Sequence, residues 1–182
     1  GIEKIMRLNR DQSASLIFEV EDPDRDPHII RLDRPNVVLL ACLRRSEQFE
    51  QASHEDLRKI GDWIGCEVKK VVARIPNARA LAAFNHRVET DANWMFEGRR
   101  IEGCVLEDAA GQFCKLKSHY YRNWKFMRSA VNEIRKAKLA GQEPRLERFA
   151  NVTEEFGQFL DWAGTLSVAA LGHDVIALRD AF

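Results

Sequence analysis

The sequence lacks most of the features that mark secreted, membrane-spanning or strongly charged proteins. Its 182 residues carry a net charge of zero at pH 7, which argues against a broad nucleic-acid-binding surface. No apolar run is long enough to cross a membrane, and the beginning does not have the pattern of a signal peptide. The four cysteines have no CxxC spacing and lie in or beside apolar runs, as buried, reduced thiols do. We therefore expect a cytoplasmic protein that does not contact membranes.

The order of the expected elements predicts an α+β fold. Apolar or alternating runs predict strands at residues 15–21, 28–32, 37–43 and 67–73. Helical patterns with capping residues lie at 53–65 and 76–88, and a short one lies at 2–8. Because strands and helices do not alternate regularly, we expect a largely antiparallel sheet.

The last third of the chain has a helical character. Apolar residues recur at helical spacing over residues 124–139, 146–166 and 168–178, interrupted at Gly141 and Pro144. The aromatic residues in this pattern are interpreted as core. We predict two parts, a mixed portion of residues 1–122 and a helical extension of residues 123–182.

A β-hairpin is predicted over residues 101–117, where two strand-forming runs flank Asp108 and Gly111. Alternation places Lys115 and Lys117 on one face of the second strand, and the first strand can bring a carboxylate near them. Two ammonium groups suit phosphate oxygens, a carboxylate suits Mg²⁺, and Gly103 allows a ligand to approach the backbone. The alternative is that these charges only form the solvent face of the hairpin.

The segment that follows the hairpin is basic. Residues 115–138 hold eight lysines and arginines against Glu133, which is typical either of a local nucleic-acid contact or of a solvated helix face. The carboxylates at 22–26 have the spacing that opens a calcium loop, but Pro27 and the missing downstream ligands argue against a metal there.

The hairpin resembles a known family. Glu102-Gly103-Cys104-Val105, followed by Lys115-Leu116-Lys117-Ser118 and then Tyr121, is similar to motifs IV and V of ATP-dependent RNA ligases of the bacteriophage tRNA-repair type. Upstream, Phe18-Glu19 resembles motif III of the same ligases. The resemblance covers roughly residues 15–121 and implies the sheet of a nucleotidyltransferase (ATP-grasp-like) domain.

The resemblance also implies cofactors and residue roles. It implies ATP and Mg²⁺, with catalysis by Lys115, Lys117 and Glu102 and metal contacts by Glu102 and Glu19. The cofactor-binding positions that it implies are Phe18, Glu19, Gly103 and Tyr121. Two of these have structural alternatives, since Phe18 also fits a core position and Tyr121 a half-buried aromatic at a helix start.

One motif of the ligases has no counterpart. Their nucleophilic lysine lies in a KxDG motif, and no lysine of this sequence is followed two residues later by Asp-Gly. We therefore expect residues 1–122 to be the carboxyl-terminal portion of an adenylyltransferase domain that works with a missing N-terminal part of the same protein on RNA 5′-phosphate and 3′-hydroxyl ends. The alternatives are a non-catalytic nucleic-acid-binding module and another superfamily member, such as a capping guanylyltransferase or a DNA ligase.

Overall fold

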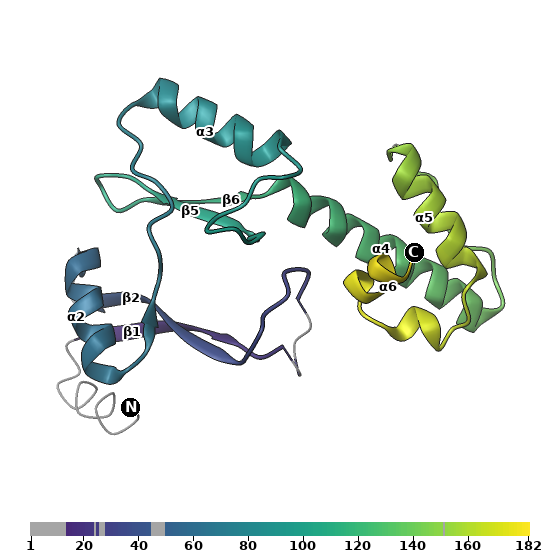
Figure 1. Cartoon of the computed structure of the whole chain (residues 1–182), viewed down its shortest axis with the longest axis horizontal. Coiled ribbons are helices and arrows are strands. Elements are labelled where there is room, and N and C mark those ends of the chain that lie inside the picture. Colours follow the sequence, from purple (N-terminus) through teal and green to yellow (C-terminus); the bar gives the residue numbers. More distant parts are fainter. Residues whose placement is uncertain (1–13, 24, 26–27, 45–49, 151) are drawn as a thin grey trace. The chain divides into compact units, whose positions relative to one another are not determined.

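The computed structural model describes residues 14–23, 25, 28–44, 50–150 and 152–182. They form two compact units, which are described separately (Figure 1). The first unit contains Gly1–Arg74 and Glu107–Phe113, and the second contains Ile75–Leu106 and Cys114–Phe182. The helix predicted at 2–8 lies outside the described residues.

Strand β2 is the centre of the sheet in the first unit. β1 (Ala14–Glu21) and β3 (Glu50–Gln51) pair with β2 (Asn36–Arg44) in antiparallel fashion, and β4 (Glu67–Val68) pairs with it in parallel. The predicted strands at 15–21 and 37–43, the central place of the latter and the mainly antiparallel pairing are thereby confirmed. β2 is central because β1, β3 and β4 all pair with it.

A β-bulge sets which residues of β2 face the core. The register shifts between Ile17 and Phe18, so that they pair with Ala41 and Leu39 and leave Leu40 as the extra residue. A single extra residue reverses the alternation of the strand. Leu39 and Cys42 therefore both contact the core cluster although they are three positions apart.

Helix α2 (His54–Ile64) covers this core as the sequence predicts. The Ser53 hydroxyl accepts a hydrogen bond from the backbone N–H of Asp56 at 3.1 Å, and Gly65 ends the helix at φ 78°. Leu57 and Ile64 pack from the helix against Leu39.

The strand predicted at 28–32 is absent from the structure. The strand predicted at 67–73 is shorter than expected. Residues 28–32 contain no strand because β1 and β2 pair directly, with Glu21 opposite Asn36, and the residues between them form the connection. Ile29 is nevertheless buried. β4 ends at Val68, which pairs with Leu39, because the next residue of β2 is the bulged Leu40.

The second unit begins with helix α3 (Ala78–Thr90), whose N-cap Asn77 accepts a hydrogen bond from the N–H of Ala80 at 2.9 Å. Strands β5 (Gly103–Glu107) and β6 (Phe113–Lys117) form the predicted hairpin, with Glu107 and Phe113 at its tip assigned to the first unit. Helix α4 (His119–Ala140) follows β6 after one residue and ends at Gly141. It runs without interruption across the predicted boundary at residue 122.

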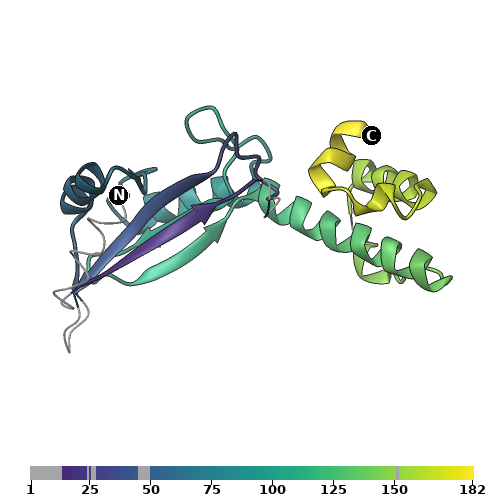
Figure 2. The same cartoon turned by 90° about the horizontal axis from the view of Figure 1, so that it is seen from below.

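Three-residue turns and two short helices complete the second unit. Figure 2 shows α5 (Glu154–Thr165) and α6 (Val175–Ala181) lying alongside α4, with the 3₁₀ turns Glu147–Phe149 and Ala170–Gly172 between the helices. The predicted aromatic core is confirmed, because Trp124 makes edge contacts with Phe156 and Phe159 at 5.4 and 5.6 Å. The single helix predicted at 168–178 is wrong, since Asp174 caps a new helix.

The cysteines are free but less buried than predicted. Cys42, Cys66 and Cys104 are half-buried and Cys114 is exposed, although strand alternation places Cys114 on the same face of β6 as the buried Leu116. Burial raises the pKa of the thiols of Cys42, Cys66 and Cys104, which keeps them protonated and unreactive. Among the described helices, none is both long and apolar enough to span a bilayer.

Candidate functional site

Local turn chemistry fixes the hairpin that carries the predicted site. The Asp108 carboxylate accepts hydrogen bonds from the backbone N–H groups of Ala110 and Gln112 at 2.8 and 2.9 Å. Gly111 has a φ of 77°, which the turn requires and which glycine adopts without strain. The predicted turn is therefore confirmed in its residues.

The hairpin and the first turn of α4 bring Glu102, Lys117 and Tyr121 together. The Lys117 ammonium donates a hydrogen bond to Oε1 of Glu102 and lies 5.1 Å from the centre of the Tyr121 ring. Lys125, one turn further along α4, lies 5.7 Å from the same ring. The three predicted site residues Glu102, Lys117 and Tyr121 thus form one cluster, with a carboxylate, an ammonium and a phenol in contact.

The cluster perturbs the Tyr121 hydroxyl. Burial raises the pKa of Tyr121, and the Glu102 carboxylate raises it further through its charge and a hydrogen bond, while Lys117 opposes them. Tyr121 therefore remains a protonated hydrogen-bond donor at neutral pH. Lys117 and Glu102 keep 37% and 35% of their side chains exposed, so both stay accessible to a ligand.

Ser118 holds the elements of the cluster in place. Its buried hydroxyl donates a hydrogen bond to the carbonyl of Ile101 at 2.8 Å and accepts one from the N–H of Tyr121 at 3.2 Å. Its own N–H donates to the carbonyl of Glu102 at 2.9 Å. Sequence reasoning placed Ser118 in a motif without a role, although a serine before a helical pattern signals an N-cap.

Gly103 is required by the neighbouring strand. It has a φ of 156°, and a Cβ atom there would lie 2.0 Å from the carbonyl oxygen of Leu116 and 2.8 Å from Cα of Lys117. Only glycine allows the two backbones to approach this closely. This contact accounts for Gly103 without a ligand, and its cofactor role stays a prediction.

Lys115 lies two residues before Lys117 on β6, on the same face by strand alternation, and it is exposed. The site therefore presents one ammonium that is paired with a carboxylate and a second that projects from the strand into solvent. Such an arrangement suits a polyanionic ligand, whose phosphate oxygens match compact ammonium charges.

A family model described as RNA ligase matches residues 2–129. The chain belongs to the RNA ligase family. The match includes β1, the hairpin and the first half of α4, and it confirms the family resemblance that the motifs predict. In the comparison with curated proteins, nothing matches the chain.

The other two residues that the ligase motifs single out lie in the first unit. Phe18 is half-buried and packs against the cluster of Leu39, Leu57 and Ile64, so it has a core role that needs no adenine. Glu19 is exposed and lies opposite Val38. Their predicted nucleoside and metal contacts stay predictions.

Glu102 is the residue of the cluster that could contact a metal ion. Within the described residues, no group of three His, Cys, Asp or Glu side chains is arranged to hold a metal ion. Mg²⁺ is commonly held by one or two carboxylates together with substrate phosphates and water. Glu102, whose side chain is 35% exposed, could supply one such carboxylate.

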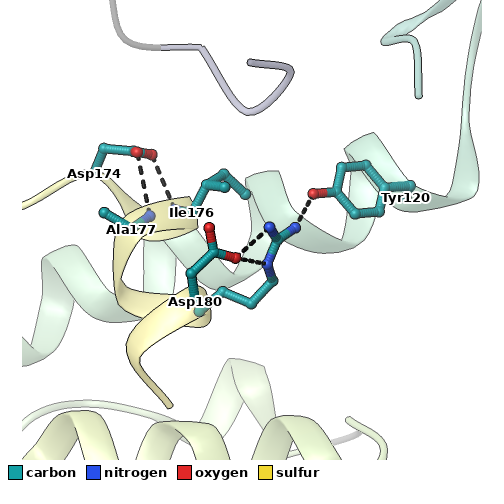
Figure 3. A network of polar contacts seen from close by, with 6 residues as sticks. Tyr120, Asp174, Ile176, Ala177 and Asp180 are labelled. Carbon is teal, nitrogen blue, oxygen red and sulfur yellow. Dashed lines mark hydrogen bonds and ion pairs between the residues drawn. The ribbon is translucent and has the colours of Figure 1, made fainter. Parts of the chain in front are cut away.

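A second polar cluster joins α6 to Tyr120 at the start of α4 (Figure 3). The Arg179 guanidinium of α6 donates hydrogen bonds to the Tyr120 hydroxyl and to the Asp180 carboxylate. The guanidinium of Arg100 lies 4.3 Å from the centre of the Tyr120 ring. Tyr120 thus joins α6 to the first turn of α4, beside Tyr121. No local sequence pattern signals this contact.

Proposed function

We propose that this chain is the phosphate-binding portion of an ATP-dependent RNA ligase. The enzyme would seal RNA 5′-phosphate and 3′-hydroxyl ends, as in RNA repair, through lysyl-AMP and RNA-adenylate intermediates. The observation that supports the proposal most directly is the contact of Glu102, Lys117 and Tyr121 in a member of the RNA ligase family.

The proposed roles follow from the charges of the cluster. Phosphoryl transfer gathers negative charge on phosphate oxygens, and positioned cations stabilise it. Lys115, which is exposed, would contact the phosphates directly. Lys117 would exchange its hydrogen bond to Glu102 for one to a phosphate oxygen, and the protonated Tyr121 hydroxyl would donate a further hydrogen bond.

Glu102 would hold Mg²⁺ jointly with the phosphates, and Glu19 is the second carboxylate that we assign to the metal. When bound, the ion would neutralise charge on the phosphate oxygens. Phe18 and Gly103 complete the proposed cofactor-binding set, with Phe18 beside the nucleoside. The ion pair of Lys117 with Glu102 holds both side chains at the site before ligand arrives.

The nucleophile would come from a different segment. Because no lysine of the 182 residues lies in a KxDG motif, we expect no covalent AMP on this chain alone. The missing motif is also the observation that favours the second candidate function, a non-catalytic nucleic-acid-binding module that has kept the hairpin.

The basic face of α4 is the proposed contact for the RNA backbone. Arg122 and Lys125 are exposed, and Arg128 is half-exposed. Replacing all three by glutamine is expected to weaken RNA binding and to flatten its salt dependence, since each phosphate contact releases counterions.

The decisive experiment is adenylylation with α-labelled ATP and Mg²⁺. The longest natural form of the protein that contains this chain, and the chain itself, are incubated with the label and run on a denaturing gel. We expect covalent label on the long form and none on the chain. Lys117→Ala and Glu102→Ala in the long form are expected to reduce labelling by two to three orders of magnitude, about the effect of losing one charged transition-state contact.

Cys114→Ala is the matched control, because Cys114 is exposed on β6 next to Lys115 and has no proposed role. It should label like the unsubstituted protein. A long form that takes up no label while still binding RNA would overturn the ligase proposal and support the binding module. Unchanged labelling of Lys117→Ala would show that the proposed phosphate site is wrong.

A further inference from the structure

A cavity lies beside the first half of α4, apart from the cluster of Glu102, Lys117 and Tyr121. It has a volume of about 420 Å³ and opens to solvent between α4 and the residues that lead into α5. Pockets for small ligands commonly range from about 300 to 1,000 Å³, so the cavity has room for one nucleotide. Of its lining residues, Arg122 alone has a role in the proposed function, as a contact for the RNA backbone.

The wall supplied by α4 is polar at one end and aromatic at the other. His119, Arg122 and Asn123 line the end near the hairpin, and Phe126 follows one turn later. The His119 ring and the Asn123 amide nitrogen are 2.7 Å apart, so each restricts the orientation of the other. His119 Nδ1 also lies 3.1 Å from the backbone carbonyl of Glu89, so both ring nitrogens are engaged within the protein. The Asn123 amide, with its second N–H and its carbonyl oxygen, is the polar group that this wall offers to a ligand.

Arg122 is held at the rim by the end of α3. Its guanidinium donates a hydrogen bond to the backbone carbonyl of Glu89 at 2.6 Å and lies 3.8 Å from the Glu89 carboxylate. Because both side chains of this ion pair are about half exposed, the pair is weak in water. The Arg122 guanidinium is therefore held in position and is still accessible to a ligand.

The opposite wall is mainly apolar, with Thr153 as its polar residue. Val152 and Phe156 line it, and the Phe156 ring packs edge-on against Trp124 with ring centres 5.4 Å apart. Glu154 and Glu155 lie in the first turn of α5, and their charges disfavour a phosphate at this helix end. The cavity therefore offers an uncharged aromatic interior and places its cation at the rim.

Resting on the proposed ligase function for the identity of the ligand, we infer that this cavity binds one nucleotide of single-stranded RNA. The base lies against Phe126 and Phe156, its polar edge meets the amide of Asn123, and its phosphate meets Arg122. Splayed RNA bases are recognised in this way, by stacking on aromatic side chains and by hydrogen bonds to their edges. The position of His119 two residues after Lys117 places this nucleotide near the ends that are joined.

The test is fluorescence anisotropy of a labelled single-stranded RNA decamer with the full chain at several salt concentrations. Val152→Phe fills the cavity, and Asn123→Ala removes its polar contact. Each is expected to weaken binding about tenfold, within the range measured for loss of base stacking. Neither should change the slope of log K against log[salt], whereas Arg122→Gln should reduce that slope by about 0.7.

Val71→Phe is the matched control, because it adds the same volume at an exposed valine of the first unit, and it should bind RNA normally. Circular dichroism and thermal melting verify that each variant is folded. Absence of RNA binding by the unsubstituted chain, or full affinity in both Val152→Phe and Asn123→Ala, overturns the inference. Because adenylylation needs no RNA, these results are distinguishable from a failure of the ligase proposal.

Discussion

The Ser118 hydroxyl donates a hydrogen bond to the backbone carbonyl of Ile101 at 2.8 Å, and so joins the start of α4 to the start of the hairpin. Through this bond and its N-cap bond to Tyr121, one buried hydroxyl fixes the distance between the two elements that carry Glu102 and Tyr121. The geometry of the proposed phosphate site therefore depends on a residue that touches no phosphate.

Ser118→Ala is expected to lower the free energy of unfolding by about 2 kcal/mol, since it removes an N-cap and a buried hydrogen bond together. Chemical denaturation measures the change. Ser53→Ala is the matched control: Ser53 caps α2 in the first unit but is exposed and bonds only within its own cap, so a loss of about 1 kcal/mol is expected. Equal losses in the two variants would contradict the tie between Ser118 and Ile101.

Gly103→Ala is expected to disrupt the hairpin. The added methyl group would lie 2.0 Å from a backbone oxygen of β6, and backbone cannot yield as a flexible side chain does. A loss of about 3 kcal/mol or more follows. Gly98→Ala is the control, because Gly98 also has a positive φ, 74°, but open space around it; it should lose only about 1 to 2 kcal/mol. If Gly103→Ala lowered the free energy of unfolding less than Gly98→Ala does, the close approach of the two strands at Gly103 would not be needed for stability.

The features that sequence predicts here are those whose causes are local. Asp108 and Gly111 specify their turn, and Ser53 and Gly65 specify the ends of α2, because each acts on backbone groups within four residues. Strand alternation alone likewise places Lys115 and Lys117 on one face of β6. These elements depend only on residues that are close in the sequence.

The features that sequence misses depend on distant partners. The absence of a strand at 28–32 follows from the pairing of Glu21 with Asn36, which leaves that segment as a connection. The truncation of β4 follows from a bulge in β2. The contact of Tyr120 with Arg179 joins residues that are 59 positions apart, and no periodicity encodes it.

The Tyr121 hydroxyl offers a spectroscopic test of the cluster. In a Tyr120→Phe background, absorbance at 295 nm follows the remaining tyrosine, since the sequence has two. We expect its pKa to lie above the ordinary value of 10.0, chiefly because of burial. Glu102→Gln should lower this pKa and Lys117→Met should raise it, as their charges act in opposite directions. Shifts of the same sign in both variants would contradict the arrangement.

The same pKa makes a prediction for stability. A folded state that binds this proton more tightly than the unfolded state loses relative stability as the unfolded phenol ionises. The contribution of Tyr121 is therefore constant below about pH 10 and falls as the pH rises further. Denaturation at pH 8 and pH 10.5 should show a smaller decline for Tyr121→Phe than for the unsubstituted chain; equal declines would show that Tyr121 is not the group responsible.

The contact between Arg179 and Tyr120 is expected to stabilise the packing of α6 on α4. Arg179→Met and Tyr120→Phe, measured singly and together by denaturation, form a double-mutant cycle whose coupling should be about 1 kcal/mol. The cycle isolates this contact because Arg100 remains over the ring in every variant. Arg148→Met is the control: Arg148 pairs with Glu133 at 3.4 Å with 61% of its side chain exposed, so its loss should cost less than about 0.5 kcal/mol. Additive effects of Arg179→Met and Tyr120→Phe would mean that this hydrogen bond contributes nothing, and that other contacts, among them the Arg179 guanidinium 5.5 Å from the centre of the Trp124 ring, keep α6 beside α4.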